Sequence, residues 1–486
     1  MNNHMLKTFG IIALFVITTM AYAQDKTKRS FYMKDVQPIV VNGVVDGYSV
    51  FKAEKRELGS NKEYFLEYYD VKGALESSVT IVRDGYYRLL ESSFNGELLC
   101  FKFFNLQTKE LVLEFFDVDG EFLYDETIET TKGEKYILVG AASGTYPWIP
   151  TLIPVAGKGF VNNRVTREKR STYFMTNYYA NEGKELDWSV DSRENGAEIN
   201  FVMPLAVIGD QLFSRNSDLF GLYDSGISIK EVETGKETAA VTFKESDLYR
   251  RITNVKELSN GQFAVSGYLL KGQKKKEKDQ GIFKLIMDKS GKEISYGEYL
   301  YSKEQLEPDF IHLHDFQYDK VGNLIVIGEI IKLGGVSVYS PETVQGPKIR
   351  IQNMVVFKFD TNMELLDYTT IEKSQKKAGM PFGAEYFGNV TLGIIANEAE
   401  AFEFVYALNK GETIDIYYYN KVKRKGEKDS YVCYKMAYDG NGNVMSSVDL
   451  GSEAKQIKVL PANGKVIIAE YIKKEKRLHF SDREFK

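Results

Sequence analysis

The sequence of 486 residues contains only two cysteines, two tryptophans, four histidines and ten prolines. Two cysteines cannot form a disulfide framework, so Cys100 and Cys433 are interpreted as two buried thiols or, alternatively, as one long-range bridge. With so few histidines, a Ser-His-Asp or Cys-His catalytic site has almost no residues on which it could be built.

Two common enzyme signatures are also missing. There is no G-x-S-x-G segment around a serine, and AGKGF at 156–160 lacks the spaced glycines and the Ser or Thr of a phosphate-binding loop. The sequence therefore gives no reason to expect a cofactor, and we expect none.

The chain lacks an excess of basic residues, because 63 Lys and Arg stand against 68 Asp and Glu, a formal net charge of -5. This balance excludes a general nucleic-acid-binding protein. Beyond the N-terminus no segment approaches 18 uncharged apolar residues, so we expect no transmembrane segment in the mature chain.

The first 23 residues have the pattern of an export signal. A short polar start with one lysine precedes the apolar run from Phe9 to Val16, and Ala21, Tyr22 and Ala23 supply small residues at a cleavage site. We expect a signal peptide at 1–23, a mature chain from Gln24, and a location in the periplasm or outside the cell.

Aromatic and β-branched residues dominate the rest of the chain, which contains 32 Tyr and 30 Phe. This composition, with almost no helical periodicity, predicts strands. An alternating run, an Asp-containing turn and a second run recur, and each copy predicts a hairpin because Asp, Asn and Gly tolerate tight turns. The copies are FLEYYDVKGAL (65–75), VLEFFDVDGEFL (112–123), IFKLIMDKSGKEI (282–294), VVFKFDTNMELL (355–366) and VCYKMAYDGNGNV (432–444).

A second hairpin signature precedes the first in the C-terminal half. Pairing the two types gives four-stranded units over about 250–300, 310–371 and 385–450, which is the pattern of β-propeller blades. We expect about seven blades, with six or eight as alternatives, and a strand within FYMKDVQPIVVNG to complete the last blade. The second-type copies are LSNGQFAVSGYLL (258–270), YDKVGNLIVIGEII (318–331), NKGETIDIYYY (409–419) and PANGKVIIAEYI (461–472).

The segments DKVGNLIVIGE (319–329) and MVVFKFDTNMELLDY (354–368) resemble the repeats of secreted bacterial β-propellers of unknown function. The WD dipeptide of one large propeller class is missing. The resemblance implies an all-β fold, a β-propeller of about seven four-stranded antiparallel blades, in a single domain over 24–486. It implies no activity, because propellers host many functions.

One segment departs from the repeat. Residues 139–171 contain three of the ten prolines, several glycines and a basic stretch. They predict a long loop or insertion that covers one blade, or alternatively a lid or docking loop.

Three expected connections between the second and third strands of a unit are rich in lysine: KGQKKKEKDQ (271–280), KVKRKGEKDS (421–430) and IKKEKR (472–477). Equivalent connections emerge on one face, so an acidic protein would carry a locally basic rim that attracts an anionic partner. Alternatively the lysines only keep exposed hairpins soluble and unpaired. The candidate binding residues are Lys274, Lys275, Lys276, Lys421, Lys423, Arg424, Lys473 and Lys474.

The segment EPDFIHLHDF at 307–316 holds the one cluster with metal-binding potential. If it is extended, His312 and His314 share one face, with Asp309 nearby as an oxygen ligand. The competing interpretation is an ordinary strand start whose polar side chains face solvent.

Together these patterns favour an exported, non-enzymatic binding or scaffold protein whose partner is a protein or an anionic envelope or polysaccharide ligand. One alternative is a polysaccharide- or polymer-active enzyme with its site near the propeller axis around Asp309, His312 and His314. Another is a purely structural part of an envelope assembly.

Overall fold

The structure is a computed structural model. It describes residues 36–41, 44–53, 61–117, 119–142, 151–168, 171–183, 186–193, 201–217, 223–244, 246–271, 278–306, 310–333, 348–380, 388–398, 401–422, 430–439, 443–450, 456–463, 465–472 and 477–486.

The first half of the chain forms four blades of antiparallel strands. Their strands are β1 (Val36–Val41), β2 (Val44–Ala53), β3 (Lys62–Asp70) and β4 (Leu75–Arg83) in blade 1; β5 (Tyr87–Phe94), β6 (Leu98–Asn105), β7 (Leu111–Asp117) and β8 (Phe122–Ile128) in blade 2; β9 (Leu152–Val155), β10 (Gly159–Glu168), β11 (Ser171–Ala180) and β12 (Trp188–Asp191) in blade 3; and β13 (Phe201–Ile208), β14 (Gln211–Ser217), β15 (Asp224–Glu231) and β16 (Glu237–Thr242) in blade 4.

The second half forms four more blades. Their strands are β17 (Tyr249–Glu257), β18 (Phe263–Lys271), β19 (Lys278–Met287) and β20 (Glu293–Leu300) in blade 5; β21 (Phe310–Tyr318), β22 (Leu324–Leu333), β23 (Lys348–Phe359), β24 (Leu365–Ile371) and the short β25 (Lys376–Gly379) in blade 6; β26 (Phe404–Asn409), β27 (Ile414–Val422), β28 (Ser430–Tyr438) and β29 (Asn443–Asp449) in blade 7; and β30 (Gln456–Ala462), β31 (Lys465–Ile472) and β32 (Arg477–Ser481) in blade 8.

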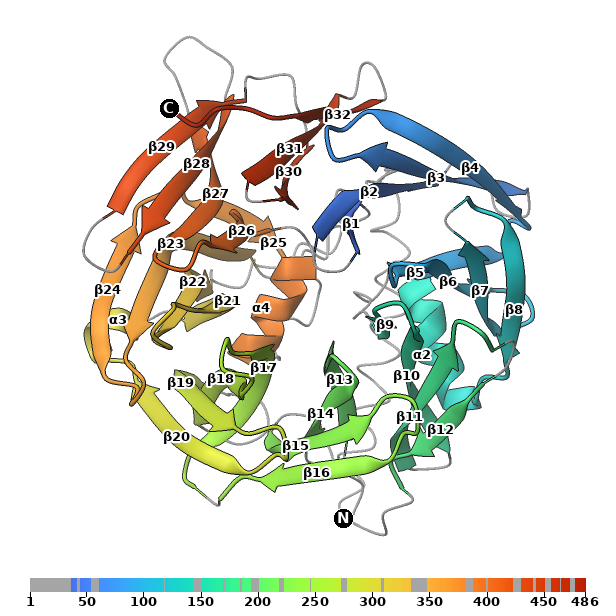
Figure 1. Ribbon diagram of the computed structural model, residues 1–486, viewed down its shortest axis with the longest axis horizontal. Helices are drawn as coiled ribbons and strands as arrows, with labels where there is room; N and C mark the ends of the chain where they lie inside the picture. The colour runs from blue at the N-terminus through green and yellow to red at the C-terminus, as the bar shows by residue number, and fades with distance from the viewer. Residues whose placement is uncertain are drawn as a thin grey trace, which may run out of the picture.

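The blades follow one another around a ring, so the all-β propeller fold is confirmed (Figure 1). Among the described residues there are eight units, one of the two alternatives to seven. Blades 4 and 5 belong to one continuous sheet, but only the pair Asp224 and Arg250 joins them. In the described part of the chain, the helices α2 (Lys132–Ala142), α3 (Lys303–Leu306) and α4 (Asn389–Glu398) lie in connections between blades.

The predicted hairpins are confirmed, and the structure shows how their sequence sets the turn. Asp70, Asp288 and Asp360 each accept hydrogen bonds from the amides two and four residues later, at 2.7–3.0 Å. The residue three positions after the Asp has a positive φ, 83° at Gly73 and 79° at Gly291, which glycine adopts without a side-chain clash. The turn residues therefore fix the strand register.

Blade 6 replaces this glycine with Met363, whose φ is 68°. A left-handed conformation costs a non-glycine residue roughly 1 kcal/mol. Its side chain is 3% exposed, in the core shared by blades 5 and 6, and a Cβ at Gly297 would lie 2.7 Å from the Met363 Cγ. Burial of the side chain offsets the backbone strain.

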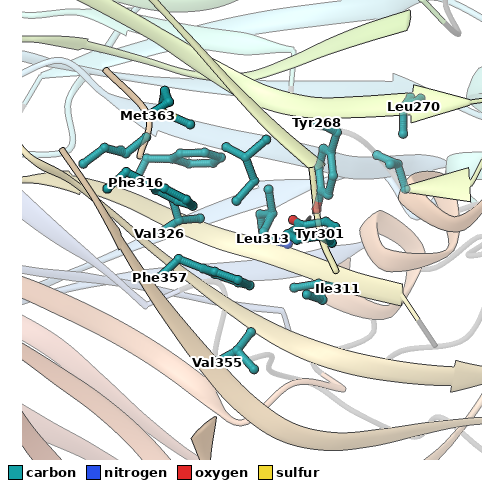
Figure 2. Packing of buried hydrophobic residues seen from close by; sticks show 14 residues of the cluster. Tyr268, Leu270, Tyr301, Ile311, Leu313, Phe316, Val326, Val355, Phe357 and Met363 are labelled. Carbon is teal, nitrogen blue, oxygen red and sulfur yellow. Dashed lines mark hydrogen bonds between the residues drawn. The ribbon is translucent and has the colours of Figure 1, made fainter. Parts of the chain in front are cut away.

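The core consists of apolar layers between neighbouring blades. In the layer between blades 5 and 6, Tyr268 and Leu270 from β18 meet Ile311, Leu313 and other side chains of blade 6 (Figure 2). Similar layers occur all round the ring, because the middle strands are apolar on both faces.

The ring closes differently from the expectation. The strand within FYMKDVQPIVVNG is β1, and it pairs with β2 in blade 1 and does not complete blade 8. The Asn-Gly dipeptide that follows favours a local hairpin. Closure comes from side chains: Asn463 of blade 8 hydrogen-bonds both backbone polar groups of Val45 at 2.8 Å, and the Phe480 ring lies 5.3 Å from that of Tyr48 and 4.7 Å from that of Tyr69.

Residues 139–171 also differ from the expected loop. Their described part contains the end of α2 and the strands β9 and β10, so most of it builds blade 3. Gly159 serves tight packing there, because a Cβ would lie 2.1 Å from the Tyr179 carbonyl oxygen, whereas Gly157 has a positive φ of 63°. Cys100 and Cys433 are both buried and free, in blades 2 and 7.

Candidate functional site

The ring has two poles with different connections. Because strands alternate in direction, the turns between strands 1 and 2 and between strands 3 and 4 of each blade share one pole, here called the turn pole. The connections between strands 2 and 3, and between successive blades, share the other, here called the connection pole.

Contacts between neighbouring blades support this division. On the turn pole the Gly157 amide of blade 3 donates to the Asn95 carbonyl of blade 2 at 2.7 Å, and the Lys320 amide of blade 6 donates to the Gly411 carbonyl of blade 7 at 3.3 Å. At these two junctions the first-hairpin turns of adjacent blades are therefore hydrogen-bonded to each other.

The connection pole carries the long excursions of the chain. The longest connection between strand ends at the turn pole is 181–187, whereas the strand ends at the connection pole are joined by 129–151, 334–347 and 372–403. Long connections on a rigid scaffold are where binding residues usually lie. This asymmetry makes the connection pole the candidate functional face.

Two of these connections contain helices, four blades apart. The helix α2 lies between blades 2 and 3 and α4 between blades 6 and 7, and in the view down the short axis α4 lies toward the centre of the ring (Figure 1). α2 is held by Arg164 of β10, whose guanidinium lies 2.8 Å from the Glu134 carboxylate, and by the buried Leu138. α4 buries Val390 and Leu392 against blades 5 and 6.

The lysine-rich connections start and end at this pole. β18 ends at Lys271 and β19 begins at Lys278, while β27 ends at Val422 and β31 ends at Ile472. Of the predicted binding residues, Lys421 lies at the end of β27. The others lie outside the described residues: Lys274, Lys275, Lys276, Lys423, Arg424, Lys473 and Lys474.

His312 and His314 lie together on β21, but not at the surface. The register of β21 against β22 shifts at His314, and the two imidazole rings are 4.8 Å apart, both against Phe402. The His312 residue is 8% exposed, so the expectation of solvent-facing side chains is wrong. Phe402 of the connection into blade 7 lies against both rings, and Phe404 at the start of β26 stacks on His314.

The predicted metal site gains no third ligand in the described part of the chain. Asp309 lies outside it, and no group of three or more His, Cys, Asp and Glu side chains there is placed to hold a metal ion. His312 Nδ1 lies 3.4 Å from the Tyr268 hydroxyl, and His314 Nε2 lies 3.5 Å from the Glu329 carboxylate. Burial, and then the neighbouring His314, hold the pKa of His312 well below its usual range.

A buried ionic network adjoins the histidines. Lys373 Nζ lies 2.9 Å from the carboxylate of Glu329 and 2.8 Å from that of Glu403, and the exposed fraction of the Lys373 and Glu329 side chains is 0%. The amides of Glu403 and Phe404 donate to the same Glu329 oxygen at 3.0 and 2.5 Å. Both ends of the 372–403 connection are thus fastened to Glu329 of β22.

The two carboxyl groups respond differently to burial. Burial alone would raise the pKa of Glu329, but His314 and the charge of Lys373 outweigh it and lower that pKa to about 2. For Glu403 burial dominates and raises the pKa, although Lys373 opposes it. Glu329 is therefore the firmly ionised partner of Lys373.

The 129–151 connection ends at a second network of this kind. Lys102 on β6 is 1% exposed, and its ammonium donates to Glu91 at 3.1 Å and to Thr151 and Asn162 at 2.6 Å. The Thr151 amide donates to Glu91 at 2.8 Å. Neither network was predicted from the sequence. Glu329 in the apolar run LIVIGEII was a signal for one of them, because an isolated charge inside such a strand needs a buried partner.

No helix in the described stretches is both long and apolar enough to cross a bilayer. The ion pairs of Lys373 with Glu329 and Glu403, and of Lys102 with Glu91, are buried. They hold the two connections that contain helices in place.

Comparisons with known proteins identify a family but no activity. A family model described as "Family of unknown function (DUF6770)" matches residues 4–482. None of the curated proteins matches the sequence.

Several solved structures are similar in fold. A europium-containing methanol dehydrogenase has a TM-score of 0.44 and 10% identity, covering 92% of this chain and 84% of that chain. The WD40 domain of SCAP from fission yeast has a TM-score of 0.39 and 8% identity, covering 89% of this chain and 95% of that chain. A PL25 ulvan lyase, which is a polysaccharide lyase, has a TM-score of 0.40 and 8% identity, covering 80% of this chain and 90% of that chain. At identities this low, the similarity shows a shared fold and nothing about activity.

Proposed function

Since the chain belongs to the family of unknown function DUF6770, we propose its function from its own surface: an exported, non-enzymatic binding protein that recognises an anionic partner at the connection pole. The observation that carries this proposal is the difference between the poles. In the described chain the turn pole carries only short connections between strands, whereas the connection pole carries both helices longer than one turn and the long connections.

The charge of the connections sets the class of partner. The segment 271–280 has five Lys against one Glu and one Asp, or 5 minus 2, a net charge of +3. The segment 421–430 has four Lys and one Arg against two acidic residues, also +3, and 472–477 has three Lys and one Arg against one Glu, again +3. Three such segments at one pole attract a polyanion, such as an anionic polysaccharide or lipopolysaccharide.

Replacing six basic residues of these connections by Gln is expected to make the protein elute from a heparin column at lower salt than the wild type. The six are Lys274, Lys275, Lys276, Lys421, Lys423 and Arg424. Fewer cations release fewer counterions and lose attraction that salt screens over about 8–10 Å. The measurement is the salt concentration at elution.

The matched control removes six exposed lysines from the turn pole, so both variants lose the same net charge. The control positions are Lys72, Lys236, Lys289, Lys292, Lys320 and Lys410. We expect this control to elute close to the wild type. Equal elution of the wild type and the connection-pole variant at low salt would defeat the proposal.

Export is part of the proposal and has its own test. N-terminal sequencing of the protein recovered from the periplasm or medium of a bacterial host is expected to begin at Gln24, because 1–23 have the charge and apolar pattern that signal peptidase recognises. Replacing Ala21 and Ala23 by bulky Leu is expected to retain the uncleaved chain. Recovery of intact chain starting at Met1 from the cytoplasm alone would contradict export.

A further inference from the structure

The outer strand of blade 1 is unlike the outer strands of the other blades. β4 has nine residues, whereas β8, β24 and β29 have seven, β20 has eight and β16 has six. In the sheet of blade 1, β4 is the terminal strand, so within the described chain only β3 pairs with it.

The middle of β4 also lacks the charges that usually protect a sheet edge. The outer strand β8 carries Asp125 and Glu126, and β20 carries Glu298 within its sequence. The outer strand β29 is also uncharged over 443–448, but it has seven residues against the nine of β4. In β4 the six residues SSVTIV at 77–82 are uncharged and contain neither Pro nor Gly. An uncharged outer strand rich in β-branched residues is a ready template for pairing with another strand.

A groove of about 380 Å³ runs along this strand. Its lining includes residues 79–83 of β4, Phe116 of β7, Gly120 of the next turn and Phe122 of β8. Consecutive strand residues point to opposite faces, so a groove that touches all of 79–83 follows the edge of the strand. Val82 is 48% and Phe122 51% exposed, large values for apolar side chains.

The groove has an acidic rim. The turn beside it carries Asp117, Asp119 and Glu121, the last two exposed. The lining residue Arg83 does not balance them, because its guanidinium is paired with the carboxylate of Glu114 and also donates to the Val82 carbonyl at 2.8 Å.

We propose that β4 is a strand-addition site for an extended segment of another protein in which apolar and basic side chains alternate. The segment pairs with the outer edge of β4, and its apolar side chains fill the groove over Phe116 and Phe122. Its basic side chains point to the opposite face and are attracted at longer range by the exposed charges of Asp119 and Glu121. Main-chain hydrogen bonds supply affinity in this mode of recognition, and the pockets for alternate side chains supply specificity. The site is separate from the connection pole and prefers the opposite charge.

The test uses two synthetic octapeptides, one alternating Val and Lys and one alternating Val and Glu, both blocked at the ends and labelled for fluorescence anisotropy. The full chain is expected to bind the lysine peptide saturably and the glutamate peptide at least about tenfold more weakly. In the variant with Ser78→Lys and Thr80→Lys the dissociation constant for the lysine peptide is expected to rise at least about tenfold, because charged lysines on an edge oppose strand addition. Both positions are exposed, so the fold tolerates the change.

The matched control places the same lysines on another outer strand, with Thr238→Lys and Ala240→Lys on β16, both exposed. Unchanged affinity in this control, and weaker affinity when Asp119→Asn is combined with Glu121→Gln, would support the site. Absence of saturable binding, or equal loss of affinity in the β4 and β16 variants, would overturn it. Sedimentation of the wild type as a dimer that the lysine peptide dissociates would also overturn it, because a second copy would then be the occupant.

Discussion

Replacing Lys373 by Met is expected to lower the free energy of unfolding at pH 7 by about 3–5 kcal/mol, because breaking a buried ion pair on one side leaves an uncompensated charge. Here two carboxylates, those of Glu329 and Glu403, lose the same partner inside the protein. The connection 372–403 also loses the contact that fastens its start. The measurement is urea denaturation followed by tryptophan or tyrosine fluorescence.

The effect of acid distinguishes this mechanism from simple loss of packing. The folded-state pKa of Glu329 is about 2, below its ordinary 4.5. Its contribution to stability is therefore fully present above about pH 4.5 and is lost as the pH falls toward 2. In the Lys373→Met variant burial acts on both carboxyl groups without a neighbouring ammonium, so protonation relieves the cost, and the gap to the wild type is expected to narrow in acid.

The control for this prediction is Lys320→Met, which removes an exposed lysine paired with Glu412. An exposed ion pair contributes little to stability, because water and salt screen it. If Lys373→Met were no more destabilising than Lys320→Met, or if its deficit were the same at every pH, the network would not hold the connection in the way described.

Replacing Gly267 by Ala is expected to destabilise the protein by about 3 kcal/mol or more, at the upper end of the cost of overpacking. Gly267 lies in β18, where a Cβ would be 1.9 Å from the Arg251 carbonyl oxygen and 3.0 Å from the Ile252 Cα. Both are backbone atoms of β17, next to a register shift, so no side chain can move aside. The displaced strand would carry Tyr268, whose hydroxyl accepts from the Leu313 amide at 2.6 Å.

Gly379→Ala is the matched change, because a Cβ at Gly379 meets nothing within 4 Å and its φ is not in the left-handed region. There the lost freedom of the unfolded chain is expected to make alanine neutral or stabilising by up to about 1 kcal/mol. The urea midpoints of the two variants should differ clearly. Similar midpoints would show that the strands of blade 5 can shift to admit a side chain.

Local turn chemistry explains why so much of the fold could be predicted from the sequence. The unit predicted over 310–371 corresponds to the strands from β21 to β24. Its two hairpins could be predicted because Asp319 and Asp360 mark the turns and an apolar run lies on each side. Each turn is decided by contacts within five residues, and such contacts can be read from a single sequence.

Long-range contacts could not be predicted in the same way. Nothing in the sequence near Phe480 shows that its ring meets Tyr48, and Lys373 gives no sign that it pairs with Glu329 and Glu403. The histidines were correctly placed on one face of a strand, but their burial depends on Phe402 in the next blade. Sequence patterns report which residues share a face, whereas the neighbouring blade decides what covers it.

The two ionic networks bear on how the connection pole can act. Lys102 and Lys373 fasten the ends of the two connections that carry α2 and α4. Binding on a surface held in this way needs little ordering of the scaffold, which lowers the entropic cost of association. The lysine-rich segments of blades 5, 7 and 8 then supply the charge between rigid strand ends.

Lysine acetylation by an amine-reactive reagent, read by mass spectrometry with and without a bound heparin oligosaccharide, tests the location of binding most directly. Labelling of Lys72, Lys236 and Lys289 at the turn pole is expected to stay unchanged, while the bound oligosaccharide protects the lysines of the connection pole: Lys274, Lys275, Lys276, Lys421, Lys423, Lys473 and Lys474. Protection concentrated at the turn pole, or spread evenly over both poles while the oligosaccharide is bound, would contradict it.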